Sequence, residues 1–193
     1  MSEAALTLVQ KEISLISEEL SLQDVFSPDE LYSLLIERRI EKQQLQEFRK
    51  NIVLFEDEFR TLPEAYEGDH YPLVHSFADG MYIRQITIPP EQLTTTKIHA
   101  RSHPYFILKG HVSVLTENGV EKLEAPYSGI TKAGTKRVIW THDEVVWITV
   151  HSTKETDLDK IEVDVIAKNF EEMDKIDKEK IDEFVRQMKL EVL

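Results

Sequence analysis

The chain of 193 residues contains no cysteine. This absence excludes disulfide bonds, thiolate-ligated metal sites and a cysteine nucleophile, and it fits a reducing compartment. No apolar run approaches the roughly 20 residues that a membrane-spanning helix needs. The first residues, MSEAALTLVQKEISLISEEL, lack the basic start and apolar stretch of a secretion signal. We therefore expect a cytoplasmic protein without a membrane partner.

Basic residues are outnumbered by acidic ones, 23 to 36, which gives a net charge of −13. A field of this sign repels nucleic acid over most of the surface, so we expect no nucleic-acid partner. The region from 94 to 140 is locally basic, however, and an anion would have to bind there. Common nucleotide-binding and hydrolase motifs (G-x-G-x-x-G, the P-loop, H-E-x-x-H and G-x-S-x-G) are missing as well.

Hydrophobic spacing divides the chain into four segments. Residues 1–60 show helical periodicity and form a predicted helical extension, and residues 61–72 contain two prolines and a glycine and are a predicted linker. Residues 73–167 contain short alternating stretches that predict a β domain, and residues 168–193 predict a C-terminal helix. The sequence SPDE at 27–30 predicts a helix start, with Ser27 as the cap and Pro28 at the first helical position.

The predicted β domain holds several short strands. They are MYIRQITI, the two halves of PYFILKGHVSVL, the two halves of RVIWTHDEVVWITVH, and KIEVDVIA, with ENG as a hairpin turn. Their spacing of about 8–12 residues is typical of a β-sandwich or barrel. The apolar stripe of the N-terminal helices can either pack on its own domain or form an oligomer interface.

Residues 80–152 resemble the cupins, a family of small jelly-roll barrels. The stretches that carry the resemblance are ITIPP, the SHPYFILKG segment, and GITKAGTKRVIW followed by VVWITVH. The resemblance implies an α+β fold in which a cupin-type barrel is flanked by N-terminal helices and a C-terminal helix. SHPYFILKG and GITKAGTKRV are also similar to small cupins encoded in tailed-phage genomes, which implies a phage protein of the host cytoplasm or the virion.

The resemblance assigns four residues to the positions of the usual cupin metal ligands. Anchored on the framework glycines Gly110 and Gly134, these positions fall on Lys97, His99, His103 and Arg137. Arginine has no lone pair to give to a metal, and lysine has one only after losing its proton. The metal ligands implied are therefore His99 and His103, with a third histidine chosen from His75, His142 and His151, and the metals implied are Fe, Mn, Ni or Zn.

The same four residues suggest a different use of the site. If Lys97, His99, His103 and Arg137 converge in one cavity, their charges call for an anionic partner. That partner could be Glu144, a carboxylate of the helices, or a small anionic ligand. We expect His70, in the linker, and His111, after a turn, to face solvent.

Three functions stay open at this stage. The first is a homo-oligomeric binding or assembly protein with a degenerate metal site that holds a small anion. The second is an enzyme in which His99 and His103 are catalytic, either a metal-free sugar-nucleotide isomerase or epimerase or a metal-dependent oxygenase. The third is a structural component of a virion.

Overall fold

The computed structural model describes residues 28–66, 68, 70–176, 178–179 and 183. The chain divides into two compact units, Met1–Phe48 and Arg49–Leu193. The division falls within helix α2, which runs over Pro28–Arg60 and begins at the proline that SPDE predicted. The predicted cap Ser27, the helical segment before it and most of the predicted C-terminal helix lie outside the described residues.

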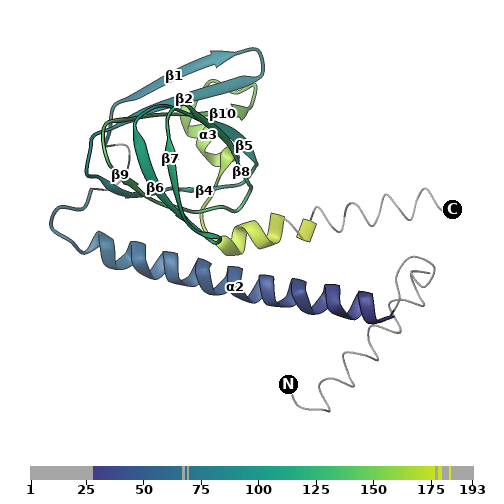
Figure 1. The fold of residues 1–193 in the computed structure, drawn as a ribbon. Coiled ribbons are helices and arrows are strands. Elements are labelled where there is room, and N and C mark those ends of the chain that lie inside the picture. Colours follow the sequence, from purple (N-terminus) through teal and green to yellow (C-terminus); the bar gives the residue numbers. More distant parts are fainter. Residues whose placement is uncertain (1–27, 67, 69, 177, 180–182, 184–193) are drawn as a thin grey trace. The chain divides into compact units, whose positions relative to one another are not determined.

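The second unit is built mainly from short antiparallel strands (Figure 1). Their bounds are β1 Leu73–Ala78, β2 Met81–Ile88, β3 Leu93–Thr95, β4 Ile98–His99, β5 His103–Lys109, β6 His111–Thr116, β7 Gly119–Glu124, β8 Tyr127–Thr131, β9 Val138–Thr141, β10 Val145–Ser152 and β11 Ile166–Ala167. The Lys-Gly turn between β5 and β6, the hairpin at ENG between β6 and β7, and the His-Asp-Glu turn between β9 and β10 are confirmed.

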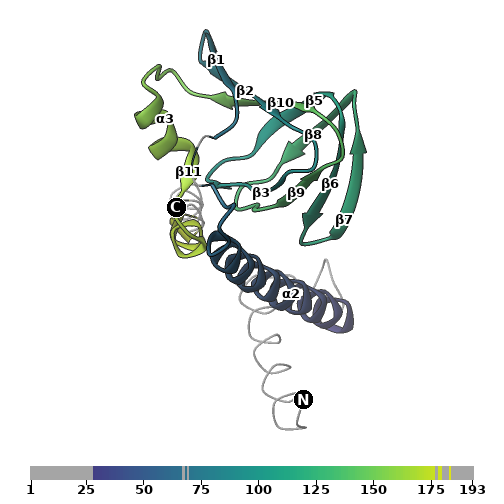
Figure 2. The same cartoon turned by 90° about the vertical axis from the view of Figure 1, so that its left-hand side faces the viewer.

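The strands form a jelly roll. One sheet has the order β1-β2-β10-β5-β8, and a second has the order β3-β9-β6-β7. The chain crosses from one sheet to the other between β2 and β3, between β3 and β5 by way of β4, between β5 and β6, and then at each of the steps β7–β8, β8–β9 and β9–β10. A chain that alternates between two antiparallel sheets in this way forms a jelly roll, which is built from two Greek keys. Figure 2 shows the sheets curving around a common interior.

The barrel core lies between the sheets because alternate residues of each strand point inward. Its buried residues are Ile88, Tyr105, Ile107, Val112, Val114, Leu123, Ile139, Val145 and Trp147. The α+β jelly-roll class expected from the sequence is confirmed. No helix of the described residues is long and apolar enough to cross a membrane.

The segment after β10 differs from the prediction. KIEVDVIA was predicted to be a strand, but the structure has helix α3 at Leu158–Val165 and only a short strand, β11, after it. The Asp157 side chain caps α3 by accepting hydrogen bonds from the backbone N–H groups of Asp159 and Lys160. Ile161 and Val165 are buried one helical turn apart. The prediction was wrong because β-branched residues at every second position also place two of them at helical spacing.

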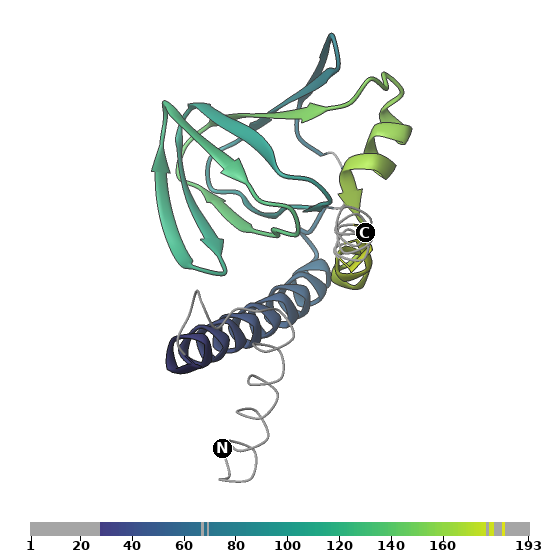
Figure 3. The ribbon, with the colours of Figure 1, turned by 90° about the vertical axis from the view of Figure 1, so that its right-hand side faces the viewer.

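The segments around α3 close one end of the barrel (Figure 3). β11 pairs with β4, and a second cluster of buried residues (Ile98, Ala100, Ala167 and Met173) lies beside this pair. Residues 170–176 are helical, and the Arg49 side chain of α2 contacts two of them, with its guanidinium 4.7 Å from the Phe170 ring and 3.1 Å from Asp174.

Candidate metal centre

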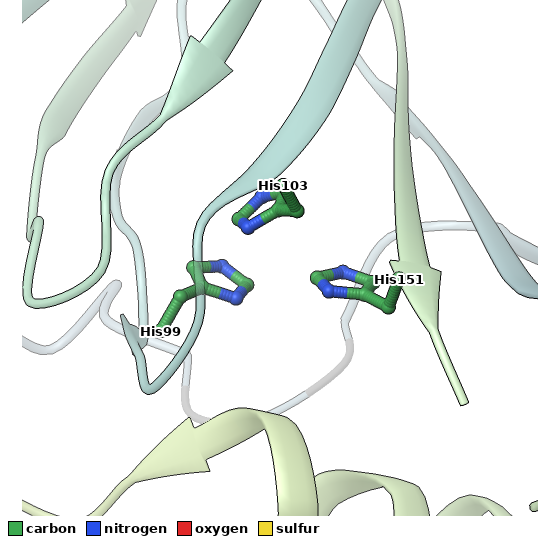
Figure 4. Close-up of side chains that lie close together, drawn as sticks. All are labelled: His99, His103 and His151. Atoms are coloured by element: carbon green, nitrogen blue, oxygen red, sulfur yellow. The ribbon is translucent and has the colours of Figure 1, made fainter. Parts of the chain in front are cut away.

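Three histidines from three strands meet at this end of the barrel. His103 begins β5 and His151 lies near the end of β10. β5 and β10 are antiparallel neighbours in the sheet, with the buried Tyr105 opposite Thr149. His103, two positions before Tyr105, and His151, two positions after Thr149, therefore point into the interior as well. His99 comes from β4, which β11 holds in place by pairing Ile166 with His99. Figure 4 shows the three rings facing one another.

The imidazoles lie close enough to share one ion. One ring nitrogen from each histidine lies within 4.8 Å of the others. The ring centroids are 4.2 Å apart for His99 and His103, 4.3 Å for His103 and His151, and 5.3 Å for His99 and His151. No acidic residue is part of this group, so all its donors are nitrogens.

The hydrogen bonds of the three histidines leave at least one ring nitrogen of each imidazole available to bind a metal. His103 Nδ1 lies 3.3 Å from the Arg101 carbonyl oxygen, which can only accept, so Nδ1 carries the proton and Nε2 keeps its lone pair. His151 Nε2 lies 3.2 Å from the Thr149 hydroxyl, which leaves Nδ1 available. His99 Nδ1 is buried and has no hydrogen-bond partner in the described part of the chain. A buried nitrogen of this kind needs a partner, because its desolvation is otherwise uncompensated.

Burial keeps all three imidazoles neutral. It lowers the pKa of His99 to about 2, and the neighbouring imidazoles and the charges of Arg84 and Arg137 act in the same direction. It also lowers the pKa of His151 to about 4. Burial lowers the pKa of His103 despite the opposing hydrogen bond to the Arg101 carbonyl. Neutral imidazole is the form that binds a metal, so the site is ready for a cation at neutral pH.

Arg137 adds a positive charge beside the histidines. Its side chain is buried, with only 8% of the residue exposed, and the guanidinium lies 5.0 Å from the centre of the Tyr105 ring. Its Nε has no hydrogen-bond partner in the described part of the chain. Tyr105 also stacks on Trp147 at 4.8 Å, and burial raises the pKa of Tyr105 to about 12, so its hydroxyl stays protonated.

The structure brings together three of the four residues that the sequence selected. His99, His103 and Arg137 lie in the barrel interior, whereas Lys97 does not. Lys97 is half exposed, and its Nζ donates to Glu162 of α3 at 2.7 Å. The expectation that Lys97 shares a face with His99 was wrong because β4 contains only Ile98 and His99, so the strand alternation does not reach position 97.

His151 is the third histidine that the sequence left open. His75 Nδ1 is instead 2.7 Å from the Tyr82 hydroxyl, and His142 Nε2 is 2.8 Å from the Ser113 hydroxyl. The alternation of VVWITVH could have selected His151, since it lies an even number of residues after the buried Trp147 and therefore faces the same way.

The other ionisable candidates lie away from the centre. Glu144, which was considered as a partner for the basic residues, accepts a hydrogen bond from Lys109 at 2.7 Å and is exposed. His70 and His111 are exposed, as predicted.

The residues present fit a divalent transition metal. Three neutral imidazoles suit Zn, Fe, Ni or Cu, whereas Mg and Ca prefer oxygen ligands. The Arg101 carbonyl fixes the tautomer of His103 in the way that outer hydrogen bonds commonly orient a metal-binding histidine. A three-protein-ligand site leaves a coordination position open for a further ligand.

Similarity to known proteins was found among solved structures alone. No family model matches the sequence, and no curated protein matches it significantly. Among solved structures, a cupin-2 domain protein from Shewanella frigidimarina shares 10% identity and a TM-score of 0.37 over 51% of this chain and 91% of that one. The Cnp3 cupin domain from Schizosaccharomyces pombe shares 14% identity and a TM-score of 0.39 over 49% and 72%.

A third similar structure is the ectoine synthase from P. lautus, with 8% identity and a TM-score of 0.40 over 50% of this chain and 74% of that one. Identities and scores this low describe a resemblance in shape. The fold itself follows from the strand order, in which the chain alternates between the five-stranded antiparallel sheet β1-β2-β10-β5-β8 and the four-stranded antiparallel sheet β3-β9-β6-β7. This chain has the cupin fold.

Proposed function

We propose that this protein binds one divalent transition metal ion through His99, His103 and His151, and that the ion and Arg137 together hold a small anionic ligand. The observation that carries the proposal is the group of three buried imidazoles whose ligand nitrogens lie within 4.8 Å of one another. The protein is then a binding module whose ligand enters the open coordination position of the metal.

The charge balance of the site supports an anion. Neutral imidazoles leave the double charge of the metal uncompensated, and Arg137 adds a further positive charge. Arg84 also acts on the site, since its charge contributes to the lowered pKa values of His99 and His151. A carboxylate or phosphate oxygen would satisfy both the metal and the planar guanidinium.

The metal-free isomerase or epimerase receives less support. A general acid or base works best when its pKa lies near the working pH. The pKa of His99 is lowered to about 2, far below that range. A metal-dependent oxygenase would use the proposed metal site, so it stays a prediction, as do the phage setting and the virion role.

Elemental analysis tests the metal site. Protein purified without chelator, then supplied in turn with Fe, Mn, Ni or Zn and desalted, should retain about one equivalent of at least one of these metals. His151→Ala should reduce retention of that metal at least about 10-fold, because only two imidazoles remain. His142→Ala is the matched control, and it should retain as much metal as the wild type. Equal metal content in both variants, or no retention by the wild type, would overturn the site.

The anion is tested separately on the metal-loaded protein. Titration calorimetry with acetate, oxalate and inorganic phosphate should reveal one that binds, and Arg137→Met should weaken its binding about 10- to 100-fold while leaving the metal content unchanged. A variant that binds every anion as the wild type does would remove Arg137 from the proposal and leave the metal site standing.

A further inference from the structure

Arg137 carries a buried charge that the barrel leaves without a polar partner. Its Nε has no hydrogen-bond partner in the described part of the chain. No acidic side chain of the described residues forms an ion pair with it either. A buried cation of this kind needs a contact that holds it in place and a charge that compensates it. The proposed anion can compensate the charge, but it cannot hold the side chain before it binds.

The main chain of Arg137 is fixed, but its side chain is long. The Arg137 N–H donates to the Thr96 hydroxyl at 3.0 Å, and the Thr96 N–H donates to the Arg137 carbonyl oxygen at 3.0 Å. These two bonds fix the backbone, whereas an unrestrained arginine side chain samples many rotamers. The position of the guanidinium therefore depends on what its own atoms contact.

The guanidinium lies over the ring of Tyr105, with its central carbon 5.0 Å from the ring centre. The π system of an aromatic face attracts a cation, and the attraction is strongest where water is excluded. Tyr105 is buried and lies two residues after His103 on β5. The charge of Arg137 contributes to the lowered pKa values of His99 and His103. The ring therefore holds the guanidinium close to the metal ligands.

Tyr105 is itself held by aromatic neighbours. Its ring stacks on Trp147 of β10, with the ring centroids 4.8 Å apart and an angle of 18° between the planes. The Tyr127 ring of β8 lies 6.0 Å away. A ring packed in this way in a dense core has little room to rotate. Tyr105 is therefore a rigid surface for the flexible arginine.

Gly129 makes room for this ring. It lies directly opposite Tyr105 in the pairing of β5 with β8. A Cβ at Gly129 would lie 2.7 Å from Tyr105 Cε1, 2.7 Å from its Oη and 2.8 Å from its Cζ, distances that real Cβ atoms do not show. The other five glycines have a positive φ, but Gly129 does not, so its backbone conformation does not require glycine. The close approach of the ring requires it.

We propose that Tyr105 is a positioning residue, whose ring, packed on Gly129, holds the guanidinium of Arg137 beside the three histidines and so sets the affinity of the site for an anion. This role rests on the proposed function, in which Arg137 and the metal bind the anion together. A guanidinium that is already in place loses less conformational freedom when the anion arrives, so it binds the anion more tightly. Because Tyr105 acts through Arg137, the aromatic ring matters and its hydroxyl does not.

The position of the guanidinium is measured on the metal-free protein by NMR of the arginine Nε–Hε groups, and Arg137→Met identifies the Arg137 signal by its loss. In the wild type and in Tyr105→Phe, the ring should shift this proton upfield and burial should slow its exchange with solvent. Tyr105→Leu should move the signal to the position of exposed arginines. A wild-type signal already at that position, or one that Tyr105→Leu leaves unchanged, would overturn the positioning role whether or not an anion binds.

The affinity is measured by calorimetry on the metal-loaded protein, with whichever of acetate, oxalate and inorganic phosphate binds the wild type. Tyr105→Leu and Gly129→Ala should each raise the dissociation constant of that anion about 10-fold, because the first removes the ring and the second displaces it. Tyr105→Phe should change the dissociation constant less than about 2-fold, because it keeps the ring. All three variants should retain as much metal as the wild type, since His99, His103 and His151 are unchanged.

Leu123→Ala is the matched control. It truncates a buried residue of the same core on the other sheet, so it should lower stability without changing the dissociation constant of the anion. Circular dichroism shows whether each variant is folded. Equal weakening in Tyr105→Phe and Tyr105→Leu, or weakening in Leu123→Ala, would overturn the positioning role. A wild type that binds none of the three anions would overturn the proposed ligand and its affinity, whereas the NMR signal decides separately whether Tyr105 holds Arg137.

Discussion

Gly110 occupies a turn between the two sheets. It joins β5 to β6 with a φ of +94°, a backbone conformation that residues with a Cβ rarely adopt. A Cβ at this position would meet the backbone oxygen of Glu144 and would lie 2.7 Å from Asp143 Oδ1 and 2.9 Å from Val145 Cγ2. Both the conformation and the close approach of the β9–β10 turn therefore require glycine here.

Gly110→Ala should lower the free energy of unfolding by about 3 kcal/mol, since it combines backbone strain with a clash against backbone atoms. Gly119→Ala provides the control. Gly119 has a similar φ of +105°, but a Cβ there would have nothing within 4 Å. Its loss should be about 1 kcal/mol, from strain alone. Urea unfolding of the two variants measures the difference, and equal losses would mean that the contact with the β9–β10 turn costs nothing.

His111 and Asp143 form an exposed pair beside this turn. His111 Nδ1 lies 2.6 Å from Asp143 Oδ2, and the hydrogen bonds that the imidazole donates to Asp143 and Glu124 raise the pKa of His111 above its usual 6.5. A raised pKa means that the pair stabilises the fold fully below about pH 6.5 and that this contribution disappears as the pH rises through the raised pKa.

Asp143→Asn should lower the pKa of His111 toward 6.5, because the amide keeps an acceptor for the His111 backbone N–H but loses the negative charge. The titration of the His111 ring protons by NMR measures this pKa. The unfolding free energies of the variant and the wild type should also converge as the pH rises from about 6 to about 9. An unchanged pKa would show that the carboxylate is not the cause of the shift.

At the candidate site, the sequence could identify the residues that motif spacing fixes. The cupin motifs selected His99, His103 and Arg137 by their spacing along the sequence from Gly110 and Gly134. The structure places both glycines at positive φ. Lys97 was assigned wrongly because a strand of two residues cannot extend its alternation. Alternation within β10 shows that His151 points inward, but its contact with His103 depends on the pairing of β5 with β10, which no spacing within one strand contains.

At the scale of the elements, α2 is joined to the barrel by a buried ion pair. Lys136 Nζ donates to Glu56 Oε1 at 2.8 Å and to the Thr96 carbonyl oxygen at 2.8 Å. The Thr95 hydroxyl donates to the same Glu56 oxygen at 2.6 Å. Burial raises the pKa of Glu56, but the hydrogen bonds from Lys136 and Thr95 outweigh it and hold the pKa below its usual value.

Glu56→Ala should lower the free energy of unfolding by about 2 kcal/mol, because Lys136, of which only 7% is exposed, loses its counter-charge. Glu58→Ala changes an exposed glutamate two residues further along the same helix and should stay within about 0.5 kcal/mol of the wild type. Thermal and chemical denaturation compare the two. Similar values for both variants would mean that the pair contributes no more than a surface charge.

Strand positions were easier to predict than the element that follows them. The two halves of PYFILKGHVSVL alternate clearly and are separated by a glycine at a turn, so β5 and β6 were found. KIEVDVIA alternates as well, but the Asp157 cap and the burial of Ile161 and Val165 together select a helix. Local pattern alone could not separate these two outcomes because the deciding contacts come from tertiary packing.

At the scale of the whole molecule, strand spacing predicted a β-sandwich or barrel and the resemblance to the cupins implied the jelly roll, whereas the distribution of charge over its surfaces could not be predicted. Acidic residues concentrate outside the locally basic region 94–140, and only the register shows that uncharged residues such as Phe106, Ile148 and Ser128 lie side by side. The sequence left open whether the apolar stripe of the N-terminal helices packs on its own domain or forms an oligomer interface, and the homo-oligomer stays a prediction.

The pairing of β4 with β11 constrains the order in which the site forms during protein synthesis. His99 is held by β4, whose partner β11 is Ile166–Ala167, and the Ala100 N–H donates to the Val165 carbonyl oxygen at 2.8 Å. The residues up to Ala167 must therefore leave the ribosome before His99 is fixed beside His103 and His151. If the three histidines bind the metal proposed above, we expect the nascent chain to take up the ion only after β11 has paired with β4, so that ion uptake would report that the barrel has closed.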